Sequence, residues 1–303
     1  MIEKFSLGVF LKKYSDNDKC LEKIKDLRWS NGIFCKQCEK ITKFYKIKGR
    51  PVFECEFGGS HQVSPLAGTI FEKTTTPLQY WFYAIYIMTQ TRSGISAKQL
   101  QRELGVTYKT AHRMFKKIRL LMTETKGDLL SGNVEIDETF VGGKGKNRAF
   151  KPNFSEIPKE VIMGMVERGG KLHTKHIPNT GKYTLLEEIQ KNVDKNASIM
   201  TDNYAGYTQL SKYGYHHFSV NHSASEYTRG EIHTQNIEGV WSQLKRGITG
   251  VYRHVSKEYL QSYSDEFSWR YNHRNDINIF DSLLKQVAEV KILKSSQLSP
   301  IQY

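Results

Sequence analysis

The sequence predicts a multidomain protein in which a small cysteine-bearing module and a helical module precede an α/β domain. The chain has 303 residues, which exceeds one ordinary domain of roughly 100–200 residues. Three of its four cysteines, Cys35, Cys38 and Cys55, cluster early in the chain, helical periodicity follows, and strand-like apolar runs come after it. These patterns predict modules at residues 1–72, 73–128 and 129–276, and a helical C-terminal tail at 277–303.

Charge is distributed unevenly along the chain. Residues 1–133 hold 23 Lys and Arg against 12 Asp and Glu, a net charge of +11, whereas residues 134–303 hold 22 against 19, a net charge of +3. Hydrophobic residues make up 38% of the chain, which excludes a wholly disordered protein. The basic front half favours a polyanion as partner. Nucleic acid is the main candidate, and an anionic membrane surface is the rival.

The sequence gives no indication of export or membrane insertion. Residues 1–18 mix charged and apolar side chains and lack a secretory core. The most apolar run, Trp81–Met88, is too short to span a bilayer. We therefore expect a soluble, cytoplasmic protein, associated with the nucleoid if the host is a bacterium.

The clustered cysteines predict a zinc site. Cys35 and Cys38 form a Cys-x-x-Cys knuckle, Cys55 follows, and His61 comes shortly afterwards. Four such ligands in two pairs suit a structural, tetrahedral Zn²⁺. Gly58 stands where a fourth cysteine is expected, so His61 is the best substitute. The alternatives are a ribbon that folds without metal and a lone surface knuckle, while a redox role lacks the strand–helix context it needs.

Three helices are predicted in the helical module. Leu78–Gln90 reads as a buried helix, and Ser96–Gln99 has the form of a capping box that opens a helix to about residue 104. Gly105 fits the left-handed stop after that helix, and Thr107 can cap the next one.

The third of these helices has two different faces. One is apolar, and the other is basic and carries Lys109, Arg113, Lys116 and Lys117. Two helices joined by a glycine turn, the second with a basic face, are typical of a helix-turn-helix whose second helix enters the DNA major groove. The alternative is an ordinary bundle with a solvated basic face. The capping, the turn and the basic front half favour DNA binding.

The α/β domain begins with a predicted strand at 134–141. Period-2 alternation gives this strand an apolar face and a polar face, formed by Val134, Ile136 and Phe140 and by Glu135, Asp137 and Thr139. Asp137 is therefore expected on a rigid element, away from the apolar face.

Further apolar runs predict strands at 161–166, 172–177 and 198–202, with a helix at 183–193. Asp202 closes the last strand, where a carboxylate can do chemistry or simply cap the next segment. A helix is predicted from about residue 234. Glu238 flanks its apolar stripe, and Lys245 lies two turns further along the same side.

Asp137, Asp202 and Glu238, with 35 residues between the last two, resemble the DDE triad of transposases and retroviral integrases. The segments around them narrow the resemblance: Ile-Asp-Glu-Thr-Phe-Val-Gly-Gly-Lys (136–144), Thr-Asp-Asn-Tyr-Ala-Gly-Tyr (201–207) and His-Thr-Gln-Asn-Ile-Glu-Gly-Val-Trp-Ser-Gln-Leu-Lys-Arg-Gly (233–247). They are similar to bacterial insertion-sequence transposases with an N-terminal zinc ribbon, relatives of the Merlin transposons. The resemblance covers about residues 21–274.

The resemblance implies a ribonuclease-H-like α/β catalytic domain with a mixed sheet. It implies that Asp137, Asp202 and Glu238 hold two Mg²⁺ or Mn²⁺ ions, with Asp137 bridging them, and that Lys245 contacts a phosphate. Hard oxygen ligands suit such ions, and a pair about 3.5–4 Å apart can assist displacement at a phosphodiester. Some relatives vary at the third position, which makes Asn236 an alternative to Glu238. The histidines at 222 and 233 are further candidate phosphate contacts.

The expected function is DNA transposition, with strand cleavage and strand transfer at terminal inverted repeats. The expected partners are double-stranded DNA, as transposon ends and target, and at least one further copy of the chain; no membrane partner is expected. Two other classes stay open. One is a DNA-binding regulator with an inactive transposase-derived domain, and the other is a ribonuclease-H-like nuclease without strand transfer.

Overall fold

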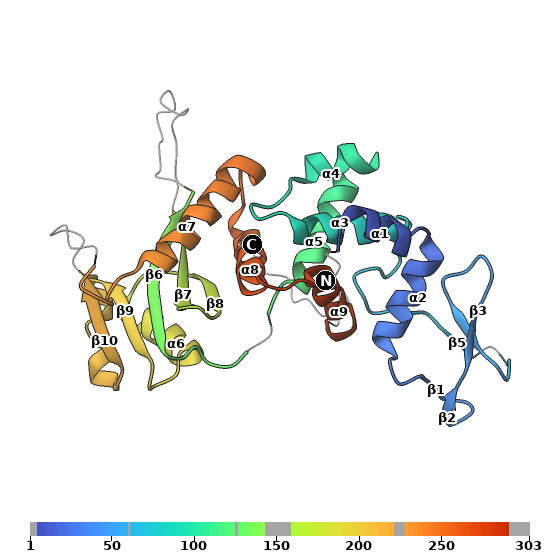
Figure 1. Ribbon diagram of the computed structural model, residues 1–303, viewed down its shortest axis with the longest axis horizontal. Helices are drawn as coiled ribbons and strands as arrows, with labels where there is room; N and C mark the ends of the chain where they lie inside the picture. Colours follow the sequence, from blue (N-terminus) through green and yellow to red (C-terminus); the bar gives the residue numbers. More distant parts are fainter. Residues whose placement is uncertain (1–4, 60, 125–126, 143–158, 221–227, 291–303) are drawn as a thin grey trace. The chain divides into compact units, whose positions relative to one another are not determined.

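The computed structural model describes residues 5–59, 61–124, 127–142, 159–220 and 228–290 (Figure 1). The chain divides into two compact units. The first comprises Met1–Thr91, Ala97–Met122 and Asp276–Tyr303, and the second Arg92–Ser96 and Thr123–Asn275. No helix in the described part of the chain combines the length and apolarity needed to cross a membrane.

Four helices of the first unit share an aromatic core. They are α1 (Leu7–Lys13), α2 (Asn17–Arg28), α3 (Leu78–Gln90) and α9 (Ile279–Glu289). Phe280 of α9 packs against Phe10, Tyr14 and Phe82, and all four rings are buried. The helix α9 therefore completes the core of the N-terminal unit.

The predicted zinc ribbon, here residues 33–63, lies in the first unit and contains very short strands. These are β1 (Ile33–Cys35), β2 (Lys40–Thr42), β3 (Phe44–Lys46), β4 (Phe53–Cys55) and β5 (Gln62–Val63). β1 and β2 form one antiparallel pair, and β3, β4 and β5 form an antiparallel sheet. Such strands bury few side chains, so this segment has little hydrophobic core of its own.

The helices α4 (Ala97–Leu104) and α5 (Tyr108–Leu121) have nearly the predicted bounds. Gly105, between them, has a φ of +65°, the left-handed conformation expected of a helix stop. Thr107 Oγ1 accepts a 3.2 Å hydrogen bond from the backbone N–H of Thr110 and so caps α5. The predicted apolar face of α5 is buried and includes Met114 and Ile118.

The second unit contains one mixed five-stranded sheet. Its strands are β6 (Asn133–Val141), β7 (Glu160–Glu167), β8 (Leu172–Ile177), β9 (Ser198–Asp202) and β10 (His216–Val220). The strand order is β10-β9-β6-β7-β8. β6, β7 and β8 are antiparallel neighbours, whereas β9 is parallel to β6, and β10 to β9.

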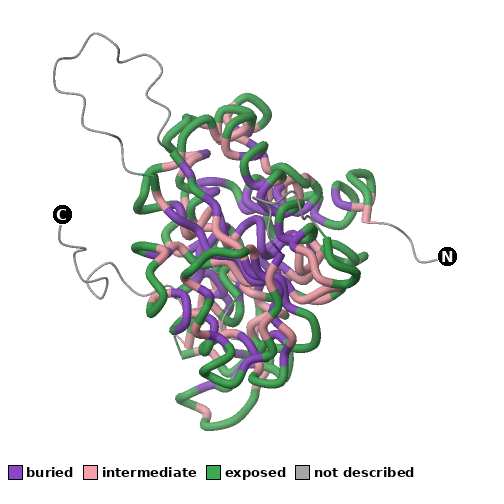
Figure 2. Tube along the Cα trace, turned by 90° about the vertical axis from the view of Figure 1, so that its left-hand side faces the viewer, coloured by how far each residue is buried: buried purple, intermediate pink, exposed green. Residues whose placement is uncertain are grey.

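Helices cover both faces of this sheet. Met163 and Met165 of β7 pack with Leu185 of α6 (Lys182–Asn192), whereas Ile162 packs with Leu244 of α7 (Gln235–Gly247). Neighbouring strand residues point to opposite faces, so α6 and α7 lie on opposite sides. Buried stretches of the chain are purple in Figure 2. The described residues of this unit also form η1 (Ala205–Tyr207), η2 (Leu210–Tyr213), the π-helical η4 (Ile248–Tyr252) and α8 (Lys257–Asn272).

One expectation about β6 is corrected. The polar face predicted for this strand is not open to water, because α7 packs over it. Glu135 is 0% exposed and Thr139 is 2% exposed, whereas Phe140, expected on the apolar face, is 52% exposed. Alternation identifies which residues share a face, but the packing of a distant helix decides which face is buried.

Candidate active site and metal cluster

The three predicted acidic residues come from three elements of the second unit. Asp137 lies on β6, Asp202 ends β9, and Glu238 lies in the first turn of α7. β6 and β9 pair in parallel with Glu135 opposite Met200. The same register carried two residues further sets Asp137 beside Asp202. Both aspartates are partly buried and Glu238 is exposed, so solvent reaches the cluster.

The surroundings of Asp137 alter its protonation. Burial raises the pKa of Asp137 to about 6, and the negative charges of Asp202 and Glu238 act in the same direction. Hydrogen bonds from the Glu138 backbone and the Trp241 indole oppose the rise. A divalent cation relieves repulsion of this kind, and carboxylate oxygens suit Mg²⁺ or Mn²⁺. The donor set therefore fits a hard cation.

Trp241 contacts Asp137 from the side of the sheet that α7 covers. Its Nε1 donates a 2.9 Å hydrogen bond to Asp137 Oδ2. Gly164 of β7 pairs with Asp137, and a Cβ atom there would lie 2.5 Å from Trp241 Cη2 and 2.7 Å from Ile237 Cδ1. Glycine thus lets α7 approach closely enough for the indole to reach Asp137. The sequence predicts Trp241 only as part of an apolar stripe, although a glycine inside the run 161–166 is a signal of close approach.

Glu138 is a fourth carboxylate beside the cluster, and the sequence does not single it out. Tyr207 Oη donates a 2.6 Å hydrogen bond to Glu138 Oε1. Burial raises the pKa of Glu138 to about 7 despite this hydrogen bond, and the charges of Asp137 and Asp202 contribute to the rise. Because neighbouring strand residues face opposite ways, Glu138 approaches the cluster from the α6 side of the sheet.

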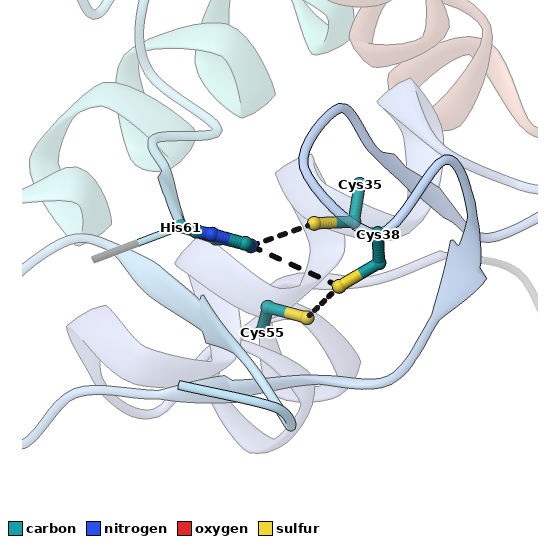
Figure 3. A group of neighbouring side chains, drawn as sticks. All are labelled: Cys35, Cys38, Cys55 and His61. Atoms are coloured by element: carbon teal, nitrogen blue, oxygen red, sulfur yellow. Dashed lines mark hydrogen bonds between the residues drawn. The ribbon is translucent and has the colours of Figure 1, made fainter. Parts of the chain in front are cut away.

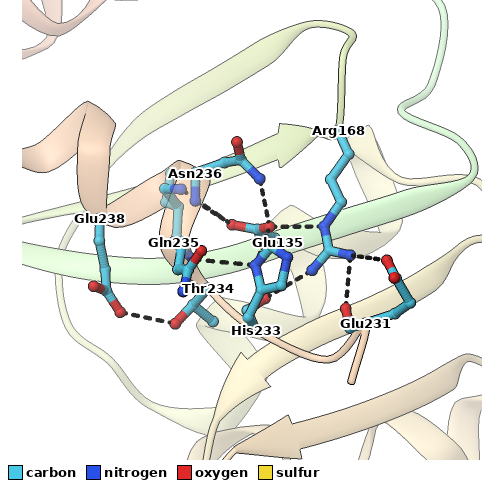
Figure 4. Close-up of polar contacts among 9 residues, drawn as sticks. Glu135, Arg168, Glu231, His233, Thr234, Gln235, Asn236 and Glu238 are labelled. Carbon is cyan, nitrogen blue, oxygen red and sulfur yellow. Dashed lines mark hydrogen bonds and ion pairs between the residues drawn. The ribbon is translucent and has the colours of Figure 1, made fainter. Parts of the chain in front are cut away.

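The other predicted site residues of this unit have different positions. Lys245 lies exposed in the last turn of α7, two turns beyond Glu238. The side-chain amide of Asn236 donates to Glu135 Oε1 at 2.8 Å, and His233 Nδ1 lies 3.2 Å from the same oxygen (Figure 4). The histidine at 222 lies outside the described residues.

A second cluster lies in the ribbon. The ligand atoms of Cys35, Cys38, Cys55 and His61 all lie within 4.8 Å of one another (Figure 3). Cys38 Sγ is 3.8 Å from Cys55 Sγ, and Cys35 Sγ is 3.0 Å from His61 Nδ1. Two sulfurs bound tetrahedrally to one zinc ion lie about 3.8 Å apart, given a Zn–S distance of about 2.3 Å. The spacing and the donor set fit zinc, with His61 in the fourth position.

The predicted basic face of α5 is partly altered by packing. Lys109, Arg113 and Lys116 are exposed. Lys117 is half-buried, and its Nζ donates a 2.8 Å hydrogen bond to the carbonyl oxygen of Ile70. Burial lowers the pKa of Lys117, and the nearby charge of Arg113 acts in the same direction. Lys117 therefore anchors α5, and the other three side chains form the exposed basic face.

Comparison with known proteins identifies two family domains. Residues 129–272 match the ISXO2-like transposase domain, and residues 15–57 match the transposase zinc-ribbon domain. The second match ends before His61. An uncharacterized protein in transposable element ISH50 of Halobacterium salinarum is 27% identical over 283 residues, covering 86% of this chain and 92% of the relative. An uncharacterized transposase-like protein of Haemophilus influenzae is 29% identical over 119 residues, covering 39% of this chain and 94% of the relative.

Two solved structures show weak likeness, each at 13% identity. One is the simian T-cell lymphotropic virus intasome in complex with PP2A regulatory subunit B56 gamma, with a TM-score of 0.31 over 63% of this chain and 68% of that chain. The other is a pre-cleavage Mos1 transpososome, with a TM-score of 0.28 over 74% of this chain and 82% of that chain. At these scores the likeness adds nothing to the assignment.

Proposed function

Because the chain carries an ISXO2-like transposase domain behind a transposase zinc-ribbon domain, we propose that it is a DNA transposase. It binds the terminal inverted repeats of its element and catalyses metal-dependent strand cleavage and strand transfer. The order and directions of the five strands support a ribonuclease-H-like fold for the catalytic domain.

The convergence of three carboxylates carries this proposal. Asp137 and Asp202 lie on the paired strands β6 and β9, and Glu238 lies in the first turn of α7, which packs over β6. Burial raises the pKa of Asp137, and the charges of Asp202 and Glu238 add to the rise. They would hold Mg²⁺ or Mn²⁺, and ions of this kind, when bound, activate the attacking oxygen and stabilise the leaving one. The strand holds Asp137 rigidly, and the indole of Trp241 orients its carboxylate. Lys245, on the exposed end of α7, would contact a DNA phosphate.

The first unit supplies the DNA-binding surface in this proposal. Residues 1–133 carry the net charge of +11, and α4 and α5 would act as a helix-turn-helix that presents Lys109, Arg113 and Lys116 to the phosphate backbone. Zn²⁺ held by the ribbon cluster would fix the fold of its short strands. Two transposon ends must be brought together, so at least two copies of the chain would assemble on DNA.

The decisive experiment incubates the purified protein with Mn²⁺ and labelled DNA that carries the terminal repeats flanking its coding sequence. Cleavage followed by joining to target DNA is the expected result. Cleavage without joining would instead indicate a nuclease, and binding without cleavage a DNA-binding regulator.

Matched aspartate variants make this experiment specific. Asp137→Asn and Asp202→Asn are each expected to reduce cleavage by about 10³-fold or more, because each removes a charged oxygen ligand. Asp194→Asn is the control. Asp194 lies shortly before β9, at the opposite end of the strand from Asp202, and its Oδ1 accepts a hydrogen bond from the backbone N–H of Asn196. Full cleavage by the Asp137 or Asp202 variants would refute the assignment.

A further inference from the structure

Glu135 is a buried carboxylate that the proposed chemistry does not use. Its side chain is 0% exposed, and it lies on β6 two residues before Asp137, on the same face of the sheet. Burying a carboxylate is costly unless its oxygens are paired and hydrogen-bonded. The partners of Glu135 therefore indicate its role.

Both oxygens of Glu135 accept hydrogen bonds from the start of α7 (Figure 4). Oε2 accepts from the backbone N–H groups of Asn236, at 2.8 Å, and Ile237, at 3.2 Å. Oε1 accepts from the side-chain amide of Asn236 at 2.8 Å. Backbone N–H groups in the first turn of a helix have no partner inside the helix. Glu135 therefore caps α7 from the neighbouring strand, with its charge at the positive end of the helix dipole.

Arg168 extends this contact to the segment that leads into α7. It directly follows β7, and its Nε donates to Glu135 Oε1 at 2.8 Å. Its Nη1 donates to the carbonyl oxygen of Glu231 at 2.7 Å, and its Nη2 to that of His233 at 3.1 Å. One buried ion pair thus connects β6, the end of β7 and the approach to α7.

The same contacts argue against a metal-ligand role for Glu135. An ionised carboxylate offers about four lone-pair sites. Two backbone N–H groups occupy Oε2, while Arg168 and the amide of Asn236 occupy Oε1. These four donors occupy the lone-pair sites that a cation would need.

We propose that Glu135 is a positioning residue, which fixes α7 on β6 and so sets Glu238 relative to Asp137. The inference rests on the proposed function, because it gives Glu135 a part in forming the carboxylate cluster. Glu135 is two residues from Asp137 along the strand, and its partner Asn236 is two residues from Glu238 along the helix. A shift of the helix at this contact therefore displaces Glu238 directly. The hydrogen bond from Trp241 to Asp137 is a second contact between the same two elements.

The test compares Glu135→Gln with Glu266→Gln in the full chain. Glu266 is an equally buried carboxylate that pairs with Arg270 within α8 and accepts a hydrogen bond from Tyr252. Both variants are expected to lower the unfolding temperature, because each weakens a buried ion pair. Only Glu135→Gln is expected to weaken Mn²⁺ binding, by about tenfold or more, in calorimetric titrations of protein freed of Mn²⁺.

The outcomes separate this inference from the proposed function. Mn²⁺ affinities that agree within about twofold between the two variants would overturn the inference alone. Failure of the unmodified chain to bind Mn²⁺ would overturn the proposed function and this inference together. Hydrogen exchange of the Asn236 and Ile237 amides gives a readout without metal. Faster exchange in Glu135→Gln but not in Glu266→Gln is expected, and equal exchange would contradict the capping contact.

Asn236 offers a second test if Glu135→Gln does not fold, because its position on α7 is exposed. Asn236→Ala removes a hydrogen bond to Glu135 and is expected to weaken Mn²⁺ binding, whereas the neighbouring Gln235→Ala is expected to leave it unchanged. Asn236→Asp distinguishes positioning from ligation. A carboxylate facing Glu135 should weaken Mn²⁺ binding further, while retained or tighter binding would mean that residue 236 is a ligand and would overturn the inference.

Discussion

The ribbon cluster and the carboxylate cluster differ in how each would depend on its metal. The four ribbon ligands come from a segment with little core, and their ligand atoms already lie within 4.8 Å of one another. The carboxylates come from two strands of a sheet whose two faces are both packed and from a helix on it, and burial, together with the charges of Asp202 and Glu238, raises the pKa of Asp137. A closed site of soft ligands is typical of structural zinc, whereas an open site of hard ligands is typical of catalysis.

Zinc would therefore stabilise the fold of the ribbon, whereas the folded sheet and α7 would position the ligands of the second metal. Removing metal should therefore unfold the ribbon but leave the sheet of the second unit intact. Three measurements test how each cluster depends on its metal and on the surrounding fold, and a fourth tests the basic face of α5.

The largest effect is expected from the ribbon. Cys38→Ser, or a strong chelator, should abolish zinc binding and unfold residues 33–63, because structural zinc supplies much of the folding energy of such a segment. Hydrogen-exchange mass spectrometry should show lost protection there and retained protection in β6 and β7.

Cys20→Ala is the matched control for the ribbon measurement. Cys20 is a buried thiol in α2, outside the cluster, and burial raises its pKa to about 12. This variant should keep one zinc ion per chain. Equal zinc content in Cys38→Ser and the unmodified protein would contradict the structural role of the cluster.

The second effect concerns packing beneath the carboxylates. Gly164→Ala should destabilise the second unit by about 1–3 kcal/mol, because the new methyl group displaces Trp241 and its hydrogen bond to Asp137. Gly239→Ala on α7 is the matched control. A Cβ there meets no atom within 4 Å, so this change should stabilise the helix by about 0.5–1 kcal/mol. Thermal unfolding measures both, and a neutral Gly164→Ala would refute the close approach.

The third effect is a dependence of stability on pH without added divalent ion. The pKa values of Asp137 and Glu138 rise on folding to about 6 and about 7, so folding favours the protonated carboxyls. Their contribution to stability is complete below about pH 4 and is lost as pH rises to about 7.

Asp137→Asn tests this dependence because it imitates the protonated form. The variant should gain stability relative to the unmodified protein between pH 5 and pH 7.5, and Mn²⁺ should stabilise only the unmodified protein. If the difference in unfolding free energy between the two proteins does not change with pH, ionisation of Asp137 does not destabilise the fold.

The smallest effect concerns the basic face of α5. Arg113→Ala should reduce the slope of log K against log salt for DNA binding by about 1, because one phosphate contact is lost. Lys117→Ala should leave the slope unchanged and lower the unfolding temperature instead, since Lys117 bonds to Ile70. Equal slopes in these two variants would contradict the division between exposed and anchoring residues.

Local patterns explain which parts of the fold were predictable. The helices α3, α4 and α5 and the strands β6 to β9 follow the predicted bounds closely, because periodicity, Thr107 and Gly105 act within a few residues. The return of α9 to the N-terminal core was not predictable, because Phe280 and Phe10 are far apart in the sequence. That α4 and α5 bind DNA stays a prediction.

Contacts between distant parts of the sequence also limit what could be predicted of the carboxylate site. Motif and spacing single out Asp137, Asp202 and Glu238, and their joint role as metal ligands stays a prediction. The roles of Glu135 and Trp241 could not be predicted, because both depend on how α7 packs on the sheet. Alternation places Glu135 on the same face of β6 as Asp137. No local pattern shows that α7, about a hundred residues further along the chain, covers this face.

The position of α9 has a consequence for biosynthesis. The first unit lacks Phe280, Leu283 and Leu284 of its core until α9 leaves the ribosome, after the whole second unit has been made. A nonsense or frameshift mutation after residue 275 would leave the second unit complete and the N-terminal aromatic core open. Exposed cores of this kind are targets of chaperones and proteases. A stable N-terminal unit therefore requires that translation continues through α9.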